Sequence, residues 1–385
     1  MATYKEQNKL NVPHLRFPKF YGEWCVSTIG EQFDLYSGNT PSRLNKEHFD
    51  GNVNWITSGE LKEHYISDTK EKISEDAATA NNLKLLHPGT FVIAIYGLEA
   101  DGVRGTGSIT CKESTISQAC MAFTQKGDVK NEFLYSWYKK HGNIIGIKYA
   151  QGTKQQNLSY DILEKFHIAY PSQDEQDKLI QFISLLDERI ATQSKLIEKL
   201  ESLIKGIAQH CIRELINGWE YVRLGDICKI TTGKLDANAQ VENGQYLFFT
   251  CAERPFNIDS YAFDTEALLI SGNGANLGYI NYYKGKFNAY QRTYVFDHFS
   301  VNIQYVKWAL KVLLPQRIAI EKSSSNTPYI VLSTLADLKI PIPNNSKQNH
   351  IADLMMSFER KLSTQLALSD LYNKQKQYLL RQMFI

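Results

Sequence analysis

A long amphipathic segment occurs twice in this chain, each time directly after a proline, and it limits the folds that the chain can adopt. In residues 172–217, apolar side chains recur with heptad spacing from Leu179 to Cys211, and Gln193 is the one polar residue in the stripe. Charged residues of both signs occupy the other faces. This pattern predicts a long helix of the coiled-coil type that ends near Asn217.

The second copy of this segment starts after Pro343 and lies 172 residues further along the chain. With this offset, Gln193 falls on Gln365. The second stripe is weaker in its middle, where Ser369 and Lys376 occupy stripe positions. We expect the two helices to pack antiparallel, with the two glutamines facing each other near the middle of the pair and fixing its register.

The regions that precede the two helices also repeat, but they start with a different offset. Trp24 matches Trp219 and Gly38 matches Gly233, an offset of 195 residues, so the first copy carries 23 additional residues. These 23 residues are a net insertion, and the extra segment of the first copy is predicted at residues 52–86. In each copy an apolar strand runs into a glycine-rich loop, a Gln follows, and then a short helix, predicted at 132–140 and 302–314. The chain is therefore a tandem duplication whose ends match and whose middles diverge.

This organisation predicts an α+β fold with two globular domains of mixed α and β structure. We expect two long antiparallel coiled-coil helices to separate the domains, and a pseudo-twofold axis to relate the two copies. About 40 residues of helix span roughly 60 Å, which would place the domains at opposite ends of a rod. The predicted boundaries are 12–171 for the first domain, 172–217 for the first helix, 218–343 for the second domain and 344–385 for the second helix.

Composition limits the location and the chemistry of the chain. Its 385 residues are 43% hydrophobic and 22% charged, and no apolar run is long enough to span a membrane. The start is polar and shows no secretion signal, and the six cysteines form no CxxC pair. We therefore expect a cytoplasmic protein with no membrane association and no zinc site. Because the net charge is only +2, binding to nucleic acid would depend on local basic patches.

Three motifs look like catalytic or cofactor sites, and each has a simpler explanation. Residues 271–278 are rich in glycine, but strand-type sequence follows them, which favours a tight turn over a dinucleotide site. Residues 326–329 nearly match the Asn-Pro-Pro-Tyr motif of amino-methyltransferases, but no cofactor-binding strand accompanies them. Asp50, Glu60 and Lys62 have nuclease-like spacing that could hold Mg²⁺, but the second copy has no counterpart. We expect no catalytic residue, no metal and no cofactor in this chain.

Polar and basic residues interleaved with aromatic residues in the loops of both copies favour DNA binding. Such loops offer donors to phosphate groups, and amide and guanidinium groups that can read base edges. The candidate DNA contacts are Asn39, Thr40, Ser42, Arg43, Thr57, Ser58, Arg104, Gln118, Lys154, Gln155, Thr250, Asn273, Asn276, Lys284, Lys286, Gln291, Arg292, Thr293, Lys322, Ser324 and Asn326.

Taken together, these motifs resemble the specificity subunit of type I restriction–modification systems. The resemblance covers nearly the whole chain from about residue 12, and it includes the Gln that follows each proline by four to five residues. One departure is Lys347-Gln348, where the family usually has Glu-Gln. The segments that carry the resemblance are 15–18, 22–24, 38–42 and 55–59 in the first copy, and 248–253, 272–274 and 285–294 in the second.

The resemblance implies that each divergent middle is a target-recognition domain that reads one half of a bipartite, asymmetric site on double-stranded DNA. The helices would act as a spacer and would dock two modification subunits, which bind S-adenosylmethionine and methylate adenine at N6. Two restriction subunits would add cleavage that depends on ATP and Mg, so this chain would be a non-catalytic specificity subunit. The residues assigned to the subunit interface are Ile183, Leu186, Ile190, Gln193, Ile197, Leu362 and Gln365.

Two other functions fit parts of the pattern. A stand-alone DNA-modifying or DNA-cleaving enzyme would use the motifs at 50–62 or 326–329. A pure interaction scaffold would use the coiled coil without DNA. A methylation assay with and without a modification subunit tests the first function, and salt-dependent binding to duplex DNA tests the second.

Overall fold

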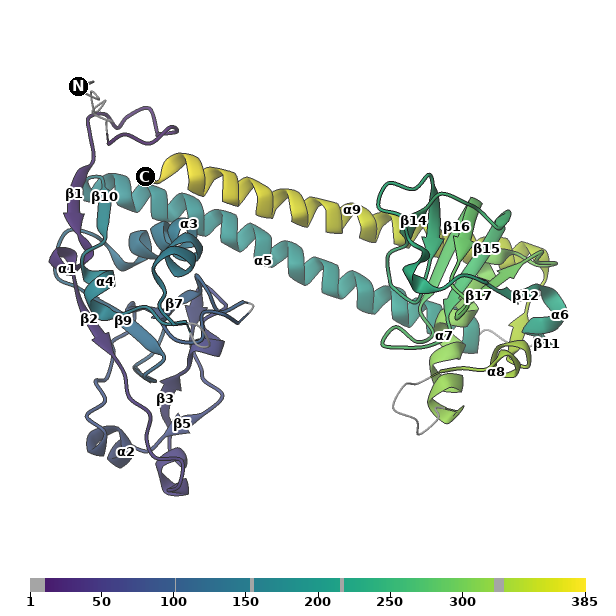
Figure 1. Ribbon diagram of the computed structural model, residues 1–385, viewed down its shortest axis with the longest axis horizontal. Helices are drawn as coiled ribbons and strands as arrows, with labels where there is room; N and C mark the ends of the chain where they lie inside the picture. Colours follow the sequence, from purple (N-terminus) through teal and green to yellow (C-terminus); the bar gives the residue numbers. More distant parts are fainter. Residues whose placement is uncertain (1–10, 101, 153–155, 215–217, 322–328) are drawn as a thin grey trace. The chain divides into compact units, whose positions relative to one another are not determined.

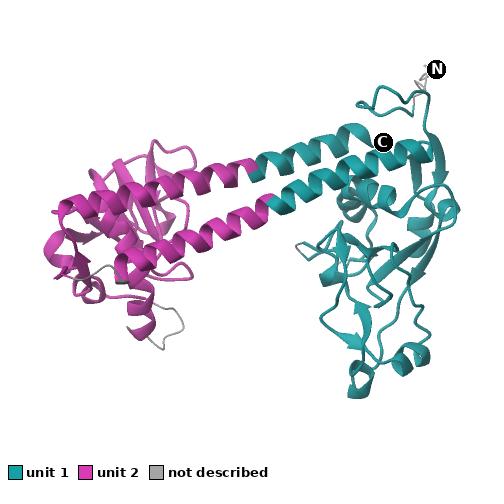
Figure 2. Cartoon of the chain, turned by 180° about the vertical axis from the view of Figure 1, so that it is seen from behind, with its two compact units in different colours: residues 1–192, 369–385 teal, residues 193–368 magenta. Residues whose placement is uncertain are grey.

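A computed structural model describes residues 11–385 except 101, 153–155, 215–217 and 322–328 (Figure 1). The chain divides into two compact units: unit 1 comprises residues 1–192 and 369–385, and unit 2 comprises residues 193–368 (Figure 2). Each unit contains one half of each long helix, α5 (Gln173–Gln209) and α9 (Asn345–Met383). Each compact unit therefore combines a globular part with one half of each long helix. The boundaries predicted from sequence treat the helices as separate segments, and they stay a prediction.

Within each unit, α5 and α9 run antiparallel and share a buried apolar seam. In unit 1, Ile183 lies in the same core as Leu380. In unit 2, Ile204 lies in the same core as Met355. The early part of α5 thus packs against the late part of α9, and the late part of α5 against the early part of α9, as the heptad stripe predicts.

A pair of glutamines interrupts this seam in unit 2. Gln193 donates from Nε2 to Oε1 of Gln365 at 2.8 Å and to its carbonyl oxygen at 3.0 Å. Gln193 is buried, so these bonds satisfy a side-chain amide that burial would otherwise leave unpaired. The prediction that the two glutamines face each other is confirmed.

The two sequence offsets correspond to two equivalent strand pairs. In unit 1, β1 (Cys25–Thr28) pairs antiparallel with β10 (His167–Tyr170). In unit 2, β11 (Glu220–Arg223) pairs antiparallel with β18 (Lys339–Ile342). The first strands differ by 195 residues, the second strands by 172, and the register is the same in both pairs. Shifting the first strand by 195 residues and the second by 172 converts every residue pair of β1 and β10 into a residue pair of β11 and β18. This agreement confirms the tandem duplication.

The divergent middles of the two copies share one strand order. Unit 2 has a six-stranded sheet with the order β12-β17-β15-β16-β13-β14. Unit 1 has the sheets β2-β9-β6-β7-β4 and β5-β3-β8, in which β7 and β8 together take the place of the longer β16. The bounds are β2 Phe33–Ser37, β3 Val53–Ile56, β4 Tyr65–Ile66, β5 Lys72–Ile73, β6 Phe91–Ala94, β7 Gly107–Thr110, β8 Ser114–Ile116, β9 Cys120–Gln125, β12 Lys229–Thr232, β13 Tyr246–Phe249, β14 Phe256–Ile258, β15 Phe263–Ser271, β16 Ile280–Ala289 and β17 Thr293–Asp297.

The assignment of residues 52–86 as an additional segment of the first copy is correct only in part. Strands β3 and β5 of this segment take the places of β13 and β14, because both β3 and β13 pair with a parallel and an antiparallel neighbour. Strand β4 and helix α2 (Glu75–Ala80) have no counterpart among the described residues of unit 2. The two copies therefore share more strands than the comparison of their sequences indicated. Strand pairing depends on backbone hydrogen bonds and is compatible with many different apolar side chains, so equivalent strands can differ in sequence.

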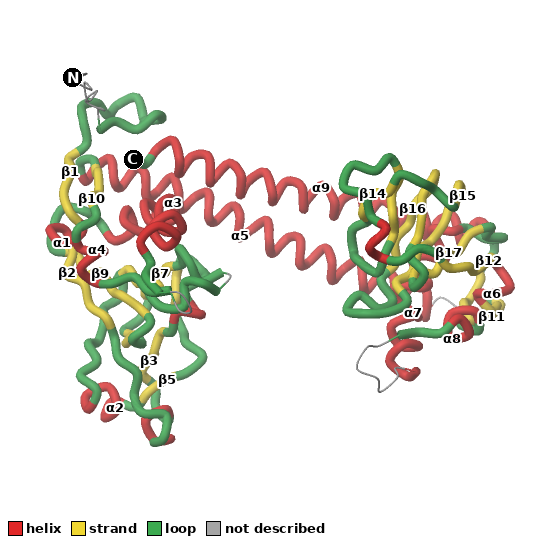
Figure 3. Tube along the Cα trace, viewed as in Figure 1, coloured by secondary structure: helices red, strands yellow, loops and turns green. Residues whose placement is uncertain are grey.

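One long helix covers the sheet in each unit. Helix α3 (Asn131–Tyr149) packs against β6, β7 and β9, and α7 (Ile303–Glu321) packs against β15 and β16 (Figure 3). Both helices have 19 residues and are longer than predicted. The shorter helices also match between the units: they are α1 Ile29–Gln32, α4 Tyr160–Glu164, α6 Leu224–Ile227 and α8 Leu332–Ala336. No helix in the described ranges is long and apolar enough to cross a membrane.

The Gln that follows each proline connects a long helix to the helix on the sheet. Gln176 is fully buried; it accepts a hydrogen bond from Lys130 N at 2.9 Å and donates to the Pro171 carbonyl at 3.0 Å. Gln348 makes the equivalent bonds in unit 2, with Asn302 N at 3.0 Å and the Pro343 carbonyl at 2.8 Å. Helix starts leave N–H groups without partners, and these glutamines supply an acceptor there. This explains why Gln recurs at this position.

Candidate functional site

Four segments that are distant in sequence meet in unit 2, and we call their meeting point the loop junction of unit 2. They are residues 233–235 after β12, 249–251 at the end of β13, 271–276 at the end of β15, and 290–292 before β17. The hydrogen bonds that join them are Gln291 N to Leu235 O at 2.9 Å, Tyr290 N to Phe249 O at 2.9 Å, Gly272 N to Arg292 O at 2.8 Å, and Asn276 Nδ2 to Cys251 O at 3.0 Å.

Unit 1 has an equivalent loop junction at the corresponding strand ends. It comprises residues 38–39, 56–58, 95–98 and 116–119. The hydrogen bonds that join these segments are Asn39 N to Ile116 O at 3.3 Å, Ser117 N to Ile56 O at 2.9 Å, and Ile95 N to Ala119 O at 2.9 Å. The two sequence copies therefore build the same local arrangement of loops, although their loop sequences differ.

One glycine in each junction is required by close packing of the backbone. A Cβ atom on Gly38 would lie 1.8 Å from the Ile116 carbonyl oxygen, and a Cβ on Gly233 would lie 1.9 Å from that of Ala289. Any side chain would push the strand ends apart, so only glycine fits. This is the physical reason for the repeated glycine that the sequence comparison found.

The junctions present amide and guanidinium groups at the surface. In unit 2, Gln291 and Arg292 are exposed and Asn276 is half-buried. In unit 1, Asn39 and Gln118 are exposed. Amide groups can pair with the edge of adenine, and a guanidinium with the edge of guanine. Both junctions thus have the chemistry for direct readout of bases, with different side chains in each.

Two candidate DNA contacts lie in the interior instead. Thr293 is 1% exposed and Thr250 is 6% exposed. Thr293 starts β17 and pairs with Ser271 of β15. Both threonines are buried in this structure, and their contact with DNA stays a prediction. The sequence did not reveal this, since the two faces of a strand alternate and the phase was unknown.

The family model described as "Type I restriction modification DNA specificity domain" matches this chain twice, over residues 21–202 and 216–368. The chain belongs to this family. The two matches follow the two copies of the duplication. The resemblance inferred from sequence is confirmed, and so is the function of DNA specificity in a type I restriction–modification system. Members of this family are generally non-catalytic and work with DNA and the restriction–modification machinery, and no finding favours a stand-alone enzyme.

Several relatives are specificity subunits by name. The EcoDI specificity subunit of Escherichia coli is 43% identical over 149 residues, which cover 39% of this chain and 31% of the relative, so the chain spans about a third of that relative's length. The MjaIX specificity subunit of Methanocaldococcus jannaschii is 24% identical over 364 residues, with 83% of each chain covered. A type I S subunit structure from M. genitalium has the same fold, with a TM-score of 0.63, 19% identity, and 97% of this chain and 99% of that chain covered.

Lys234 is a further candidate DNA contact that the sequence analysis did not identify. It is exposed, lies between Gly233 and Leu235 in the loop junction, and occupies the position equivalent to Asn39. The offset of 195 residues that matched the two glycines would have identified it. Lysine side chains commonly bind DNA phosphate groups, so Lys234 can contribute affinity for the DNA backbone in unit 2.

Other candidate residues of the specificity domains already have partners within the chain. Arg104 donates from Nη2 to Gln156 Oε1 at 2.9 Å. Lys284 lies 3.3 Å from a Glu266 oxygen, and the Lys286 ammonium lies 4.7 Å from the ring centroid of Tyr261. The remaining described candidates are Ser42 and Arg43, both exposed, and Thr40, Thr57, Ser58 and Asn273, all half-buried. Lys154, Gln155, Lys322, Ser324 and Asn326 lie outside the described residues.

The seven residues assigned to a subunit interface belong to the helices of the seam. Ile183 is 1% exposed, and Gln193 and Ile197 are also buried within the chain. Leu186 and Leu362 are half-buried against the cores of units 1 and 2, and Ile190 and Gln365 are also half-buried. Packing in the seam explains why five of these residues are apolar, and Gln193 and Gln365 are the pair that hydrogen-bonds within it. The exposed apolar residues of α5 are different ones, Leu185, Leu196 and Leu203.

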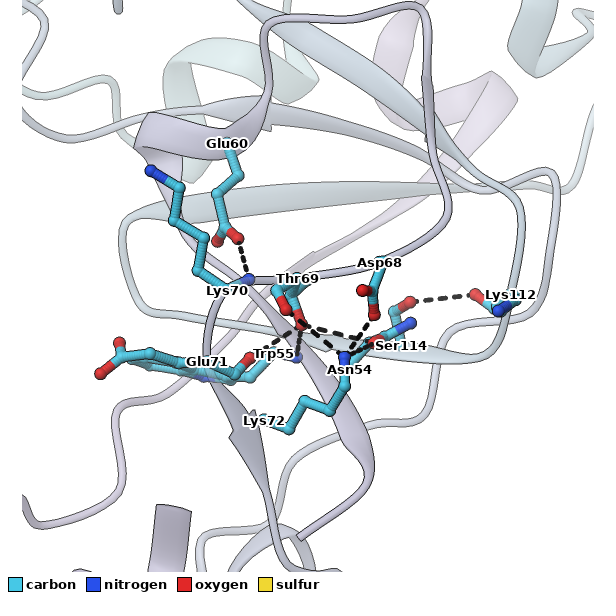
Figure 4. A network of polar contacts seen from close by, with 10 residues as sticks. All are labelled: Asn54, Trp55, Glu60, Asp68, Thr69, Lys70, Glu71, Lys72, Lys112 and Ser114. Carbon is cyan, nitrogen blue, oxygen red and sulfur yellow. Dashed lines mark hydrogen bonds and ion pairs between the residues drawn. The ribbon is translucent and has the colours of Figure 1, made fainter. Parts of the chain in front are cut away.

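The nuclease-like motif has a structural role. Glu60 accepts hydrogen bonds from Lys70 N at 2.7 Å, as Figure 4 shows, and from the backbone N and hydroxyl of Thr57 at 2.9 and 2.7 Å. Both carboxylate oxygens are thus used to fix loops. Within the described ranges, no three His, Cys, Asp or Glu side chains come together as metal ligands. The Asn-Thr-Pro part of the other motif lies outside the described residues.

Proposed function

We propose that each unit of this chain reads one half of a bipartite, asymmetric site on double-stranded DNA, and that the long helices set the unread spacer. The observation that carries this proposal is the pair of loop junctions. Both are built on the same strand ends, yet they present different side chains. Two readers of one design and different chemistry suit a target with two different halves.

The chemistry of each junction supports different readout. Gln118 and Asn39 offer amides in unit 1, and an amide pairs in bidentate fashion with adenine. Unit 2 adds Arg292 beside Gln291, and an arginine fork pairs with the O6 and N7 atoms of guanine. Lys234 would add contact with phosphate in unit 2.

The partners follow from the family. We propose that two modification subunits dock on the helices, bind S-adenosylmethionine and methylate adenine at N6. Two restriction subunits would supply cleavage with ATP and Mg, and this chain would hold no cofactor. The complex would act in the cytoplasm. Leu185, Leu196 and Leu203 are about half exposed on α5, and exposed apolar residues of this kind support docking of a protein partner.

Methylome sequencing of a host that carries this chain and its modification subunit tests the proposal. We expect adenine methylation in one asymmetric motif with two specified halves and an unspecified spacer. Replacing Gln291 or Arg292 with alanine should weaken binding by about 1–3 kcal/mol if each makes a bidentate base contact. Specificity should relax in one half-site and stay unchanged in the other.

The control is Arg223→Ala, which removes an exposed arginine from β11 of the same unit, outside the loop junction. It should leave the motif unchanged. A continuous motif, or loss of specificity in both halves after Arg292→Ala, would contradict the division of labour between the units.

A further inference from the structure

Arg43 and Glu71 form a bidentate ion pair on the surface of unit 1. Nη1 and Nη2 of Arg43 each donate to one carboxylate oxygen of Glu71 at 2.8 Å. The side chains are 59% and 41% exposed. Exposed ion pairs contribute little to the stability of a fold, because water screens them and both side chains must be ordered. Stability alone therefore gives little reason for so well-ordered a geometry.

Aromatic rings hold the Arg43 guanidinium near the loop junction of unit 1. Its central carbon lies 5.0 Å from the ring centroid of Phe49 and 5.7 Å from that of Trp55. Trp55 is buried, and its Nε1 donates to the Asn39 carbonyl at 3.2 Å. Because Asn39 belongs to the junction, the ring connects Arg43 to the surface that we assign to DNA. Contact with the rings orients the guanidinium plane.

The backbone of Glu71 is fixed from the other side by the polar network in Figure 4. Thr69 donates from its hydroxyl to the Glu71 carbonyl at 2.7 Å. Lys72 pairs with Asp68 and donates to Asn54 Oδ1 at 3.1 Å. The Glu71 carboxylate is left to face Arg43. The hydrogen bond from Arg43 lowers the pKa of this carboxyl, so it is ionised at neutral pH.

We infer that Glu71 competes with DNA for Arg43 and thereby suppresses binding to duplexes that do not carry the target. A carboxylate offers two acceptor atoms to a guanidinium fork, as a phosphate or the edge of guanine does. In the free chain Glu71 occupies those donors, and its charge repels the phosphate backbone. A target that aligns with Arg43 can displace it, whereas a poorly aligned duplex cannot. This inference rests on the proposed function and deepens it.

The test measures binding of the full chain to a random-sequence duplex over a range of salt concentrations. Glu71→Gln should bind this duplex about threefold to tenfold more tightly at low salt, with a salt slope steeper by about 1, because one more cation reaches phosphate. Selection from a randomised duplex library should give a less defined motif in one half-site. In an Arg43→Ala background, Glu71→Gln should have little further effect, because the competition is gone.

The matched control is Asp226→Asn in unit 2. Asp226 of α6 also forms a bidentate pair with an arginine, Arg223 of β11, at 3.0 Å for both bonds, and this pair lies outside the loop junction of unit 2. Equal gains of affinity from Glu71→Gln and Asp226→Asn would overturn the inference, as would an unchanged effect of Glu71→Gln without Arg43. If the unaltered chain shows no salt-dependent binding to any duplex, the proposed function is overturned with it. Equal melting temperatures would confirm that the variants fold.

Discussion

The two units use carboxylates at equivalent positions of the long helices, Asp187 and Glu359, but give them different partners. In unit 2, Glu359 accepts from Lys307 at 2.7 Å and from Lys311 at 3.0 Å, so it ties α7 to α9. In unit 1, Asp187 pairs with Lys376 of α9, and its other oxygen lies 3.5 Å from His64 Nδ1. The repeated part of the fold places a carboxylate at this position in both units, and the segments that differ between the units supply its partners.

His64 lies beside a strand of unit 1, β4, that has no counterpart among the described residues of unit 2. It directly precedes β4, and its ring is stacked between Tyr65 and Tyr135 at 4.1 and 4.0 Å between centroids. Its Nε2 lies 2.8 Å from a Glu132 oxygen. Burial lowers the pKa of His64, but hydrogen bonds to Asp187 and Glu132 outweigh it and raise the pKa above 6.5. An insertion has therefore given unit 1 a titratable link where unit 2 has lysine–glutamate pairs.

The largest expected effect concerns the seam that both units share. Ile183 and Met355 are equivalent positions and are 1% and 0% exposed. Replacing either with alanine should lower the free energy of unfolding of its unit by about 2–5 kcal/mol, because buried contacts are lost and a cavity remains. Hydrogen exchange measured peptide by peptide checks this in each unit separately. A much smaller loss of stability in one unit would show that polar contacts, and not apolar packing, hold its seam together.

The second comparison removes each carboxylate in turn. Asp187→Asn should remove the charged partner of Lys376 and one of the two carboxylate partners of His64, and should destabilise unit 1 by roughly 1–3 kcal/mol. Glu359→Gln should do the same in unit 2, where the Lys307 side chain is only 9% exposed. We expect faster hydrogen exchange in α3 for the first variant and in α7 for the second. Faster exchange in both helices for either variant would mean that the links do not act locally.

The smallest expected effect is the pH dependence of unit 1. A histidine whose folded pKa is raised contributes stability that is complete below pH 6.5 and is lost as pH rises through the folded value. Two other titratable groups of unit 1, both in α3, set the pH window of this loss. Burial lowers the pKa of His141 to about 4 and that of Lys139 to about 8. The protonated form of each group therefore destabilises the folded unit, and this destabilisation disappears as the pH rises. For His141 the change is complete by pH 6.5, and for Lys139 it begins only above about pH 8. Unit 1 should therefore weaken between pH 6.5 and 8.

His64→Gln should remove this loss, as measured by the denaturation midpoint of unit 1 at several pH values. Unit 2 is the internal control. Its Glu359 has a lowered pKa, which gives stability that is present above pH 4.5 and is lost only as pH falls through the folded value. A similar loss in unit 2 between pH 6.5 and 8, or its persistence in His64→Gln, would disconnect the effect from His64.

Much of the frame could be predicted because it depends on periodic or repeated features. The heptad stripe predicted α5 and α9, and the two offsets predicted which strands are equivalent. The positions of Gln193 and Gln365 on that stripe were enough to predict their contact. The candidate site was less predictable. Gln291 and Arg292 lie at the surface of a loop junction, but Thr250 and Thr293 are buried, and Lys234 was missed.

The sequence by itself determined the duplication, the antiparallel helices and the membership of this chain in its family, because local periodicity and matched motifs are written along the chain. The tertiary structure decided which residues meet. The convergence of loops at each junction, the ion pair of Arg43 with Glu71 and the stacking of His64 all join residues that are distant in sequence. Such contacts depend on the strand order and on the phase of each strand, and a single sequence specifies neither in a form that can be read locally.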